Sequence, residues 1–167
     1  MNPLRLNVAE LMRKPGSVKE IEFLCVSGDV GIIDPRVGAT ATVEVSLTVA
    51  SMSDGMVVSG VIGAPWHDTC RRCLADIDAM TRTEVRELYQ LTVTDPDAFP
   101  VIGDQIDLTS MVREAVELDL AMAPLCRDDC AGLCPTCGID LNLESCACQP
   151  APMDPRWAAL DVWRDDL

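Results

Sequence analysis

Alternation of apolar and polar residues, the pattern of a strand that buries one face, recurs along the first half of this chain. Leu4 to Val8 alternates in this way. Glu20 to Val26 does so as well, with Ile21, Phe23 and Cys25 on one face. Both segments predict β-strands that pack one side against a core.

A β-hairpin is the clearest local prediction. Two segments rich in β-branched residues, Thr40 to Ala50 and Met56 to Ile62, flank the turn signal Ser-Asp-Gly at 53–55. Upstream, the short amphipathic segment Ala9 to Lys14 is stopped by a Pro-Gly pair and predicts about one turn of helix.

The region after the hairpin predicts a turn, one long strand and a loop. Pro65 to Thr69 has the composition of a turn. Ala75 to Thr94 alternates and predicts a single strand that returns beside the hairpin, although Glu84 to Gln90 would also tolerate a helix. Asp95 to Gln105, acidic and interrupted by two prolines and a glycine, predicts an exposed loop.

One main helix is predicted over residues 108–122, where Asp107 or Thr109 can cap the first turn and Pro124 follows the end. Its apolar stripe has a helical period and consists of Leu108, Met111, Val112, Ala115, Val116, Leu118 and Met122. A second, short amphipathic helix is predicted for Arg156 to Leu167, and packing on the protein's own body is favoured over packing on a partner.

These elements predict an α+β fold that is mainly β. We expect an antiparallel sheet or a partly closed barrel, one main helix and a C-terminal zinc lobe. The predicted organisation is a body over 1–123, a cysteine-rich zinc-binding segment over 124–150 and an acidic tail over 151–167.

The charge is strongly negative and uneven. The chain carries 13 Lys and Arg against 27 Asp and Glu, a formal net charge of −14, and residues 93–167 account for −11 of it. Because binding to phosphates scales with Lys and Arg contacts, this balance argues against broad nucleic-acid binding. A basic protein partner fits better.

The cysteine count is best explained by metal binding in a reducing compartment. Residues 1–10 lack the pattern of a targeting signal, and no segment has the length and hydropathy of a membrane span. We therefore expect a cytoplasmic protein that has no membrane association. In such a compartment, nine cysteines are more often metal ligands than disulfides.

Eight of the cysteines fall into pairs whose spacing suits zinc: Cys70 and Cys73, Cys126 and Cys130, Cys134 and Cys137, and Cys146 and Cys148. We expect two zinc ions. The preferred partition joins the first two pairs across the fold and leaves the last two pairs as a self-contained terminal site. In the alternative, the second and third pairs form one site and the fourth meets the first, or only one site fills.

Other roles for these residues are weaker. A four-thiolate site is closed and has no open position for an activated water, which favours structure over catalysis. A redox role for the pair Cys70 and Cys73 is a minor alternative. His67 is more plausibly a turn residue than a ligand, and Cys25 a small core residue. No glycine-rich phosphate loop or Ser-His-Asp set is evident, so we predict neither enzymatic activity nor a small-molecule substrate.

Several segments together resemble the YceD family, the large ribosomal RNA subunit accumulation proteins. They are Cys70-Arg-Arg-Cys73-Leu74, Glu84 to Gln90, Ala123-Pro-Leu-Cys126, Cys130-Ala-Gly-Leu-Cys134-Pro-Thr-Cys137-Gly138 and Leu141-Asn142. Two more, Val8 to Gly16 and Asp154 to Trp157, are similar to actinobacterial members. The resemblance thus extends over nearly the whole chain.

The resemblance implies a non-enzymatic role in making, processing or stabilising large-subunit (23S) rRNA during ribosome assembly. Combined with the charge, it suggests that the acidic C-terminal half binds a basic ribosomal protein or assembly factor. A competing hypothesis is direct rRNA contact through a local group of arginines, namely Arg71, Arg72, Arg82 and Arg86.

Overall fold

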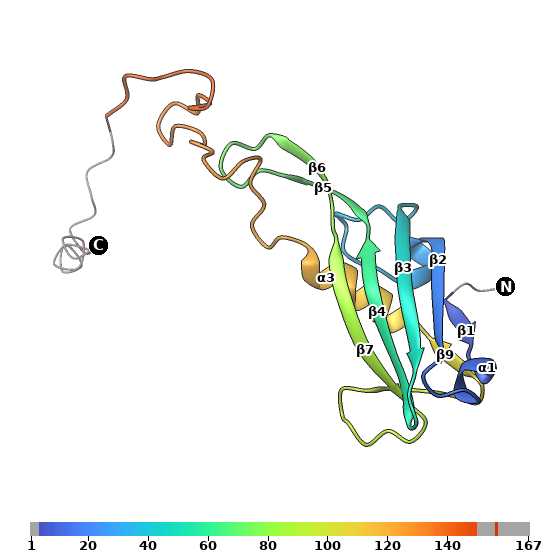
Figure 1. The fold of residues 1–167 in the computed structure, drawn as a ribbon. Helices are drawn as coiled ribbons and strands as arrows, with labels where there is room; N and C mark the ends of the chain where they lie inside the picture. The colour runs from blue at the N-terminus through green and yellow to red at the C-terminus, as the bar shows by residue number, and fades with distance from the viewer. Residues whose placement is uncertain (1–3, 150–155, 157–167) are drawn as a thin grey trace.

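The computed structural model describes residues 4–149 and residue 156. Its strands are β1 (Arg5–Asn7), β2 (Val18–Val26), β3 (Thr42–Ser51), β4 (Gly55–Gly63), β5 (Pro65–Thr69), β6 (Asp76–Met80), β7 (Thr83–Gln90), β8 (Phe99–Pro100) and β9 (Gln105–Asp107). Its helices are α1 (Ala9–Met12), α2 (Ser27–Val30) and α3 (Thr109–Asp119). The predicted α+β, mainly β class with one main helix is confirmed (Figure 1).

The main sheet has the strand order β2-β3-β4-β7-β8 and stays open. Its first four strands pair antiparallel, and β8 pairs parallel with β7. The predicted hairpin is confirmed as β3–β4, in which Val49 lies opposite Val58 and the Met52 N–H donates to the Gly55 carbonyl oxygen at 2.8 Å. Residues 44–51 pair with residues 56–63 without interruption because the turn is short and the flanking residues are β-branched.

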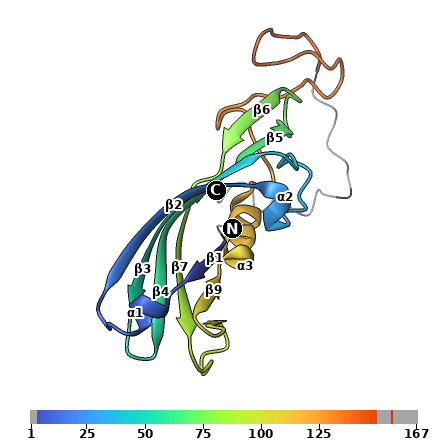
Figure 2. The ribbon, with the colours of Figure 1, turned by 90° about the vertical axis from the view of Figure 1, so that its right-hand side faces the viewer.

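One face of this sheet forms the core. Figure 2 shows α3 together with β1 and β9 on that side of the sheet. Alternate residues of β3 and β4 point into the core, and the fully buried side chains there include Val43, Val49, Val58 and Ile62 of the sheet and Val112 of α3. Burying such side chains contributes about 2 kcal/mol each, so this interface is the main source of stability for the body.

Gly60 of β4 is required by the close approach of its neighbour β3. A Cβ atom at this position would overlap the backbone carbonyl oxygen of Ser46, and the glycine has a φ of +153°. Residues that have a side chain rarely adopt this backbone conformation. Gly60 therefore lets the two central strands pack at this point.

The prediction of one long strand over 75–94 is wrong, because the chain bends at Thr81. The Ala64 N–H donates to the Thr81 side-chain oxygen at 2.9 Å, and the Thr81 N–H donates to the Ala64 carbonyl oxygen at 2.9 Å. This buried exchange separates β6 from β7. Pro65 to Thr69 is likewise not a turn: it forms β5, which pairs antiparallel with β6 as a separate hairpin.

Helix α3 is shorter than the predicted span 108–122. Leu120 has extended backbone angles and turns its own side chain inward, with 4% exposed. Leu118, inside the helix, and Met122, beyond it, are 85% and 100% exposed, so the predicted apolar stripe does not continue through them. At the other end, Asp107 accepts the Thr109 N–H at 2.9 Å, one of the two predicted caps.

The predicted loop over 95–105 contains β8 and the first residue of β9, while α2 has no counterpart among the predictions. The helix predicted for the tail lies outside the described residues, apart from Arg156. Within residues 4–149, no helix has both the length and the apolar character that crossing a bilayer requires.

Candidate metal centres

The first pair of cysteines lies in the loop of the β5–β6 hairpin. The Cys70 N–H donates to the Ala75 carbonyl oxygen at 2.7 Å, and the Leu74 N–H donates to the Cys70 carbonyl oxygen at 2.9 Å. Leu74 has a φ of 60°, the left-handed conformation that closes the loop. This tight turn places the side chains of Cys70 and Cys73 on the same side of the loop.

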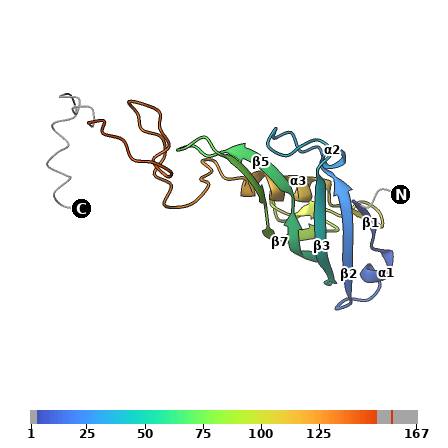
Figure 3. The same cartoon turned by 90° about the horizontal axis from the view of Figure 1, so that it is seen from above.

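The segment after α3 delivers the second pair to this loop. The Arg71 N–H donates to the Pro124 carbonyl oxygen at 3.0 Å, which fixes the chain just before Cys126. The Arg72 guanidinium donates to the Cys130 carbonyl oxygen at 2.9 Å, which fixes the chain at the second cysteine. In Figures 1 and 3, this segment leaves α3 and runs beside the β5–β6 hairpin toward its loop, away from the main sheet.

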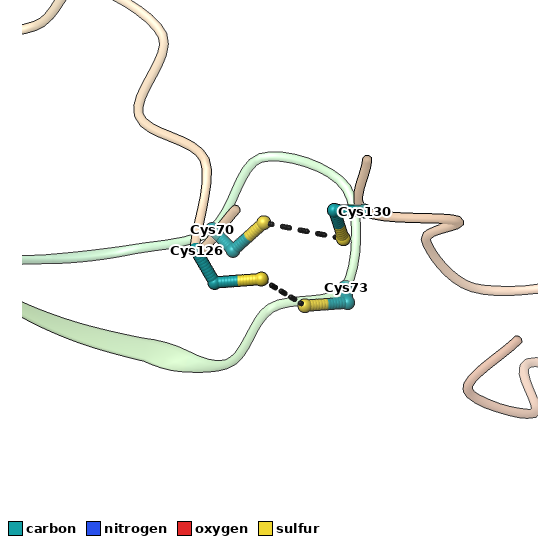
Figure 4. Close-up of side chains that lie close together, drawn as sticks. All are labelled: Cys70, Cys73, Cys126 and Cys130. Carbon is teal, nitrogen blue, oxygen red and sulfur yellow. Dashed lines mark hydrogen bonds between the residues drawn. The ribbon is translucent and has the colours of Figure 1, made fainter. Parts of the chain in front are cut away.

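Cys70, Cys73, Cys126 and Cys130, here called cluster 1, bring their sulfur atoms together (Figure 4). The Sγ atoms of Cys70 and Cys130 are 3.8 Å apart, and those of Cys73 and Cys126 are 3.6 Å apart. Four thiolates at a Zn–S distance of 2.3 Å form a tetrahedron whose edges are about 3.8 Å. The residues of cluster 1 therefore fit a zinc ion.

Cys134, Cys137, Cys146 and Cys148 form a second group, here called cluster 2, with all four sulfurs within 4.8 Å of one another. Its first pair lies in a loop like that of the hairpin. The Cys134 N–H donates to the Ile139 carbonyl oxygen at 2.9 Å, and the Gly138 N–H donates to the Cys134 carbonyl oxygen at 2.9 Å. Gly138, with a φ of 74°, takes the left-handed position that Leu74 takes in cluster 1.

The two clusters differ in exposure. In cluster 1 only Cys126 is exposed, and the buried sulfurs pack against Ile77, Leu125 and Leu133. In cluster 2 only Cys134 is buried. An ion in cluster 1 would thus be shielded by apolar side chains, while an ion in cluster 2 would lie close to solvent.

Each cluster contains one thiol that ionises easily. The backbone N–H of Cys73, and then other nearby donors, lower the pKa of Cys70 to about 6. The backbone N–H of Cys137 does the same for Cys134, whose pKa is also lowered to about 6. Hydrogen bonding to Cys73 and burial raise the pKa of Cys126 to about 12. Thiolates surrounded by N–H donors are the ligands that a soft divalent cation prefers.

The structure groups the eight thiols as in the preferred partition and not as in the alternative partition. Zinc ligation by these residues stays a prediction. His67 belongs to neither cluster: it lies on β5, and its Nδ1 atom is 3.0 Å from the Asp78 carboxylate. Cys25 is buried in the core of the body. Cys70 is fully buried as well, which does not favour thiol exchange with a partner.

Two residues around the clusters were missed by the sequence reasoning. The sequence indicates Arg72 only as a positive charge, whereas its guanidinium donates to the backbone of Cys130. The sequence places Asn142 in a motif that indicates no role for it, whereas its side-chain amide donates to the Cys130 sulfur at 3.4 Å. The position of Asn142 five residues after a Cys-x-x-Cys pair was the only available signal.

A mainly β body that presents two groups of four thiols, one shared between a hairpin loop and the segment after the main helix, defines the thiol-rich class of candidate metal-binding proteins. The chain belongs to the YceD family. The family model described as "Large ribosomal RNA subunit accumulation protein YceD" matches residues 58–162, which include both clusters.

Relatives include bacterial and plant proteins. An uncharacterized protein of Mycobacterium tuberculosis is 32% identical over 167 residues, covering 95% of this chain and 80% of the relative. An uncharacterized protein of Mycobacterium leprae is 29% identical over 168 residues, covering 96% and 77%. A chloroplastic protein of Zea mays named as a YCED homologue is 38% identical over 53 residues, covering 31% and 18%. No solved structure matches the chain.

Proposed function

We propose that this protein is a non-enzymatic ribosome-biogenesis factor that supports the synthesis, processing or stability of large-subunit rRNA. Membership of a family named for large ribosomal RNA subunit accumulation is the observation that carries the proposal. Two zinc ions, one in each cluster, hold the segment over 124–149 in place. In this role all four thiols of a cluster surround the ion, which leaves no coordination position for chemistry.

A basic ribosomal protein or assembly factor is the partner that the charge favours. Within residues 124–149, the single basic residue Arg127 is outnumbered by four acids, Asp128, Asp129, Asp140 and Glu144. Asp128, Asp129 and Glu144 are exposed. A divalent ion held by four thiolates adds further negative charge, so the lobe attracts Lys-rich and Arg-rich surfaces and repels bare RNA.

Direct rRNA binding through the predicted group of arginines is the second candidate, although Arg71 and Arg72 lie in the loop of cluster 1 and Arg86 lies in β7 of the main sheet. Arg71 and Arg86 are exposed and could meet a phosphate. Arg72 is a poor probe of this hypothesis, because its guanidinium already donates to the Cys130 backbone. A charge reversal there would disturb the cysteine cluster whether or not RNA binds.

Two probes separate the candidates: proteins extracted from purified large subunits, and protein-free 23S rRNA. If the partner is a basic protein, the zinc-loaded protein binds some of the proteins extracted from large subunits. The double variant Asp128→Lys and Glu144→Lys loses this binding, and the control Arg71→Glu with Arg86→Glu keeps it. If the protein binds RNA directly, it retains the 23S rRNA. The variant Arg71→Glu with Arg86→Glu then loses the rRNA, and the variant Asp128→Lys with Glu144→Lys keeps it.

An unchanged ratio of 23S to 16S rRNA in cells depleted of the protein would overturn the functional proposal itself.

A further inference from the structure

A ladder of backbone hydrogen bonds runs between the two clusters. The Leu133 N–H donates to the Arg72 carbonyl oxygen at 3.0 Å, which joins the hairpin loop of cluster 1 to the residue just before Cys134. The Leu141 N–H then donates to the Gly132 carbonyl oxygen at 2.9 Å. The loop that carries cluster 2 is therefore built directly on the loop that carries cluster 1.

Asn142 connects this ladder to a ligand sulfur. Its side-chain oxygen accepts the Ala131 N–H at 2.8 Å and a guanidinium N–H of Arg127 at 2.8 Å. Its side-chain nitrogen donates to the Cys130 Sγ atom at 3.4 Å and to the Asp140 carboxylate at 2.6 Å. Because the Ala131 N–H can only donate, it fixes which end of the amide points at the sulfur.

Asn142 belongs to the covalent span of cluster 2 but contacts a residue of cluster 1. Asn142 lies between Cys137 and Cys146, and an ion held by the four thiols of cluster 2 would close this span. An ion in cluster 2 would therefore order the loop from which Asn142 reaches Cys130. The N–H donated to sulfur stabilises the thiolate that binds the ion in cluster 1.

We propose that Asn142 couples the two clusters, so that metal binding in cluster 2 raises the metal affinity of cluster 1 and the reverse holds equally. The inference rests on the proposed metal binding and adds that the two ions bind cooperatively. Asn142 acts here as a positioning residue and not as a ligand. Coupling between sites is reciprocal because both ions stabilise the same arrangement of the shared loop.

Cobalt(II) provides a direct readout, because its thiolate complexes absorb visible light in proportion to the number of occupied sites. We expect the full-length reduced protein to bind two Co(II) ions, with the affinity of cluster 1 measured by competition with a chelator. Serine at both Cys134 and Cys137 removes cluster 2. This double variant should bind Co(II) in cluster 1 about tenfold more weakly, within the range for coupled sites and for groups that orient metal ligands.

Variants of Asn142 test whether this residue carries the effect. Asn142→Ala should weaken cluster 1 about tenfold by itself, and should weaken it no further in the protein that lacks cluster 2. Asn142→Asp keeps an acceptor for the Ala131 N–H but places an oxygen where the donor to sulfur was, so it should behave like Asn142→Ala. Leu143→Ala, at a neighbouring side chain that is 81% exposed, is the matched control and should leave both affinities unchanged.

The outcomes are distinguishable. Equal affinity of cluster 1 with and without cluster 2 would overturn the coupling while leaving metal binding intact. Additive losses from Asn142→Ala and from removal of cluster 2 would overturn the role of Asn142. A wild-type protein that binds no Co(II) would overturn the proposed metal binding as well. Circular dichroism of the main sheet checks that each variant is folded.

Discussion

Arg72 and Cys130 lie 58 positions apart in the sequence, and the Arg72 guanidinium donates a hydrogen bond of 2.9 Å to the Cys130 carbonyl oxygen. A second, longer contact of 3.4 Å reaches the Asp128 carbonyl oxygen. One side chain from the β5–β6 hairpin thus fixes the backbone that carries a thiol of cluster 1. Arg72 therefore has a structural role in addition to the positive charge that it carries.

Removal of this side chain should weaken cluster 1. Arg72→Ala loses the bonds to the backbone at Cys130 and Asp128, which together contribute about 1–2 kcal/mol. We expect faster loss of metal to a chelator and an unchanged main sheet. Arg71→Ala is the control, because Arg71 contacts Pro124 through its backbone, which the substitution keeps. Equal rates of metal loss in the two variants would contradict the structural role.

Metal removal should loosen the C-terminal segment before the body. Binding to four thiolates can contribute on the order of 10 kcal/mol to the order of a segment. The segment over 124–149 has few buried side chains of its own, so we expect protease cleavage there soon after chelation. The fragment that covers the main sheet should persist. Mass spectrometry of timed digests locates the first cuts, and a digestion pattern unaffected by chelator would rule out this role of the metal.

Gly60→Ala should be strongly destabilising. The added methyl group would overlap the Ser46 carbonyl oxygen of β3, and neither backbone can move without breaking the pairing of β3 with β4. We expect a loss of about 3 kcal/mol, seen as a fall in the thermal midpoint of the zinc-loaded protein. Gly38→Ala is the control, since no atom lies within 4 Å of the added carbon. Similar midpoints for both variants would contradict the close approach.

His67 offers a pH titration that can be assigned without ambiguity, since the chain has one histidine. Its hydrogen bond with Asp78 favours the imidazolium and raises the pKa of His67 above the ordinary 6.5. The contribution of the pairing to stability is therefore fully present just below the ordinary histidine pKa of 6.5 and is lost as the pH rises through the raised pKa. NMR of the imidazole protons should show the raised value, and Asp78→Asn should lower it. A pKa that is the same in both proteins would contradict the pairing.

The parts of the fold that could be predicted are those fixed by local pattern. The β3–β4 hairpin follows from β-branched residues on both sides of a Ser-Asp-Gly turn, and those residues pair with one another. The β5–β6 hairpin could not be found in this way. Its strands are short and polar, and their boundary depends on a hydrogen bond between Thr81 and Ala64 that no local pattern indicates.

The candidate site likewise has a part that the sequence predicts and a part that depends on tertiary structure. Spacing was sufficient to find the eight thiols and to favour one partition. The grouping in the structure, however, depends on where α3 ends and on the bond from Arg71 to Pro124, both of which are tertiary features. The role of Asn142 could not be predicted from the sequence for a similar reason. Its contact with Cys130 exists only after the chain has turned back through Gly132 and Gly138.

The two clusters differ in the length of chain that each one closes, and this difference bears on the order of folding. Cluster 1 joins Cys73 to Cys126, 53 positions apart, whereas Cys134 and Cys148 of cluster 2 are 14 positions apart. Closing the longer loop costs about 1 kcal/mol more in chain entropy, and the sheet and α3 must form first to bring its ends together. In the proposed metal-bound protein, the four thiols of cluster 2 come together without the closure of a long loop. We expect the newly made protein to take up its first ion there and its second only once the body has folded.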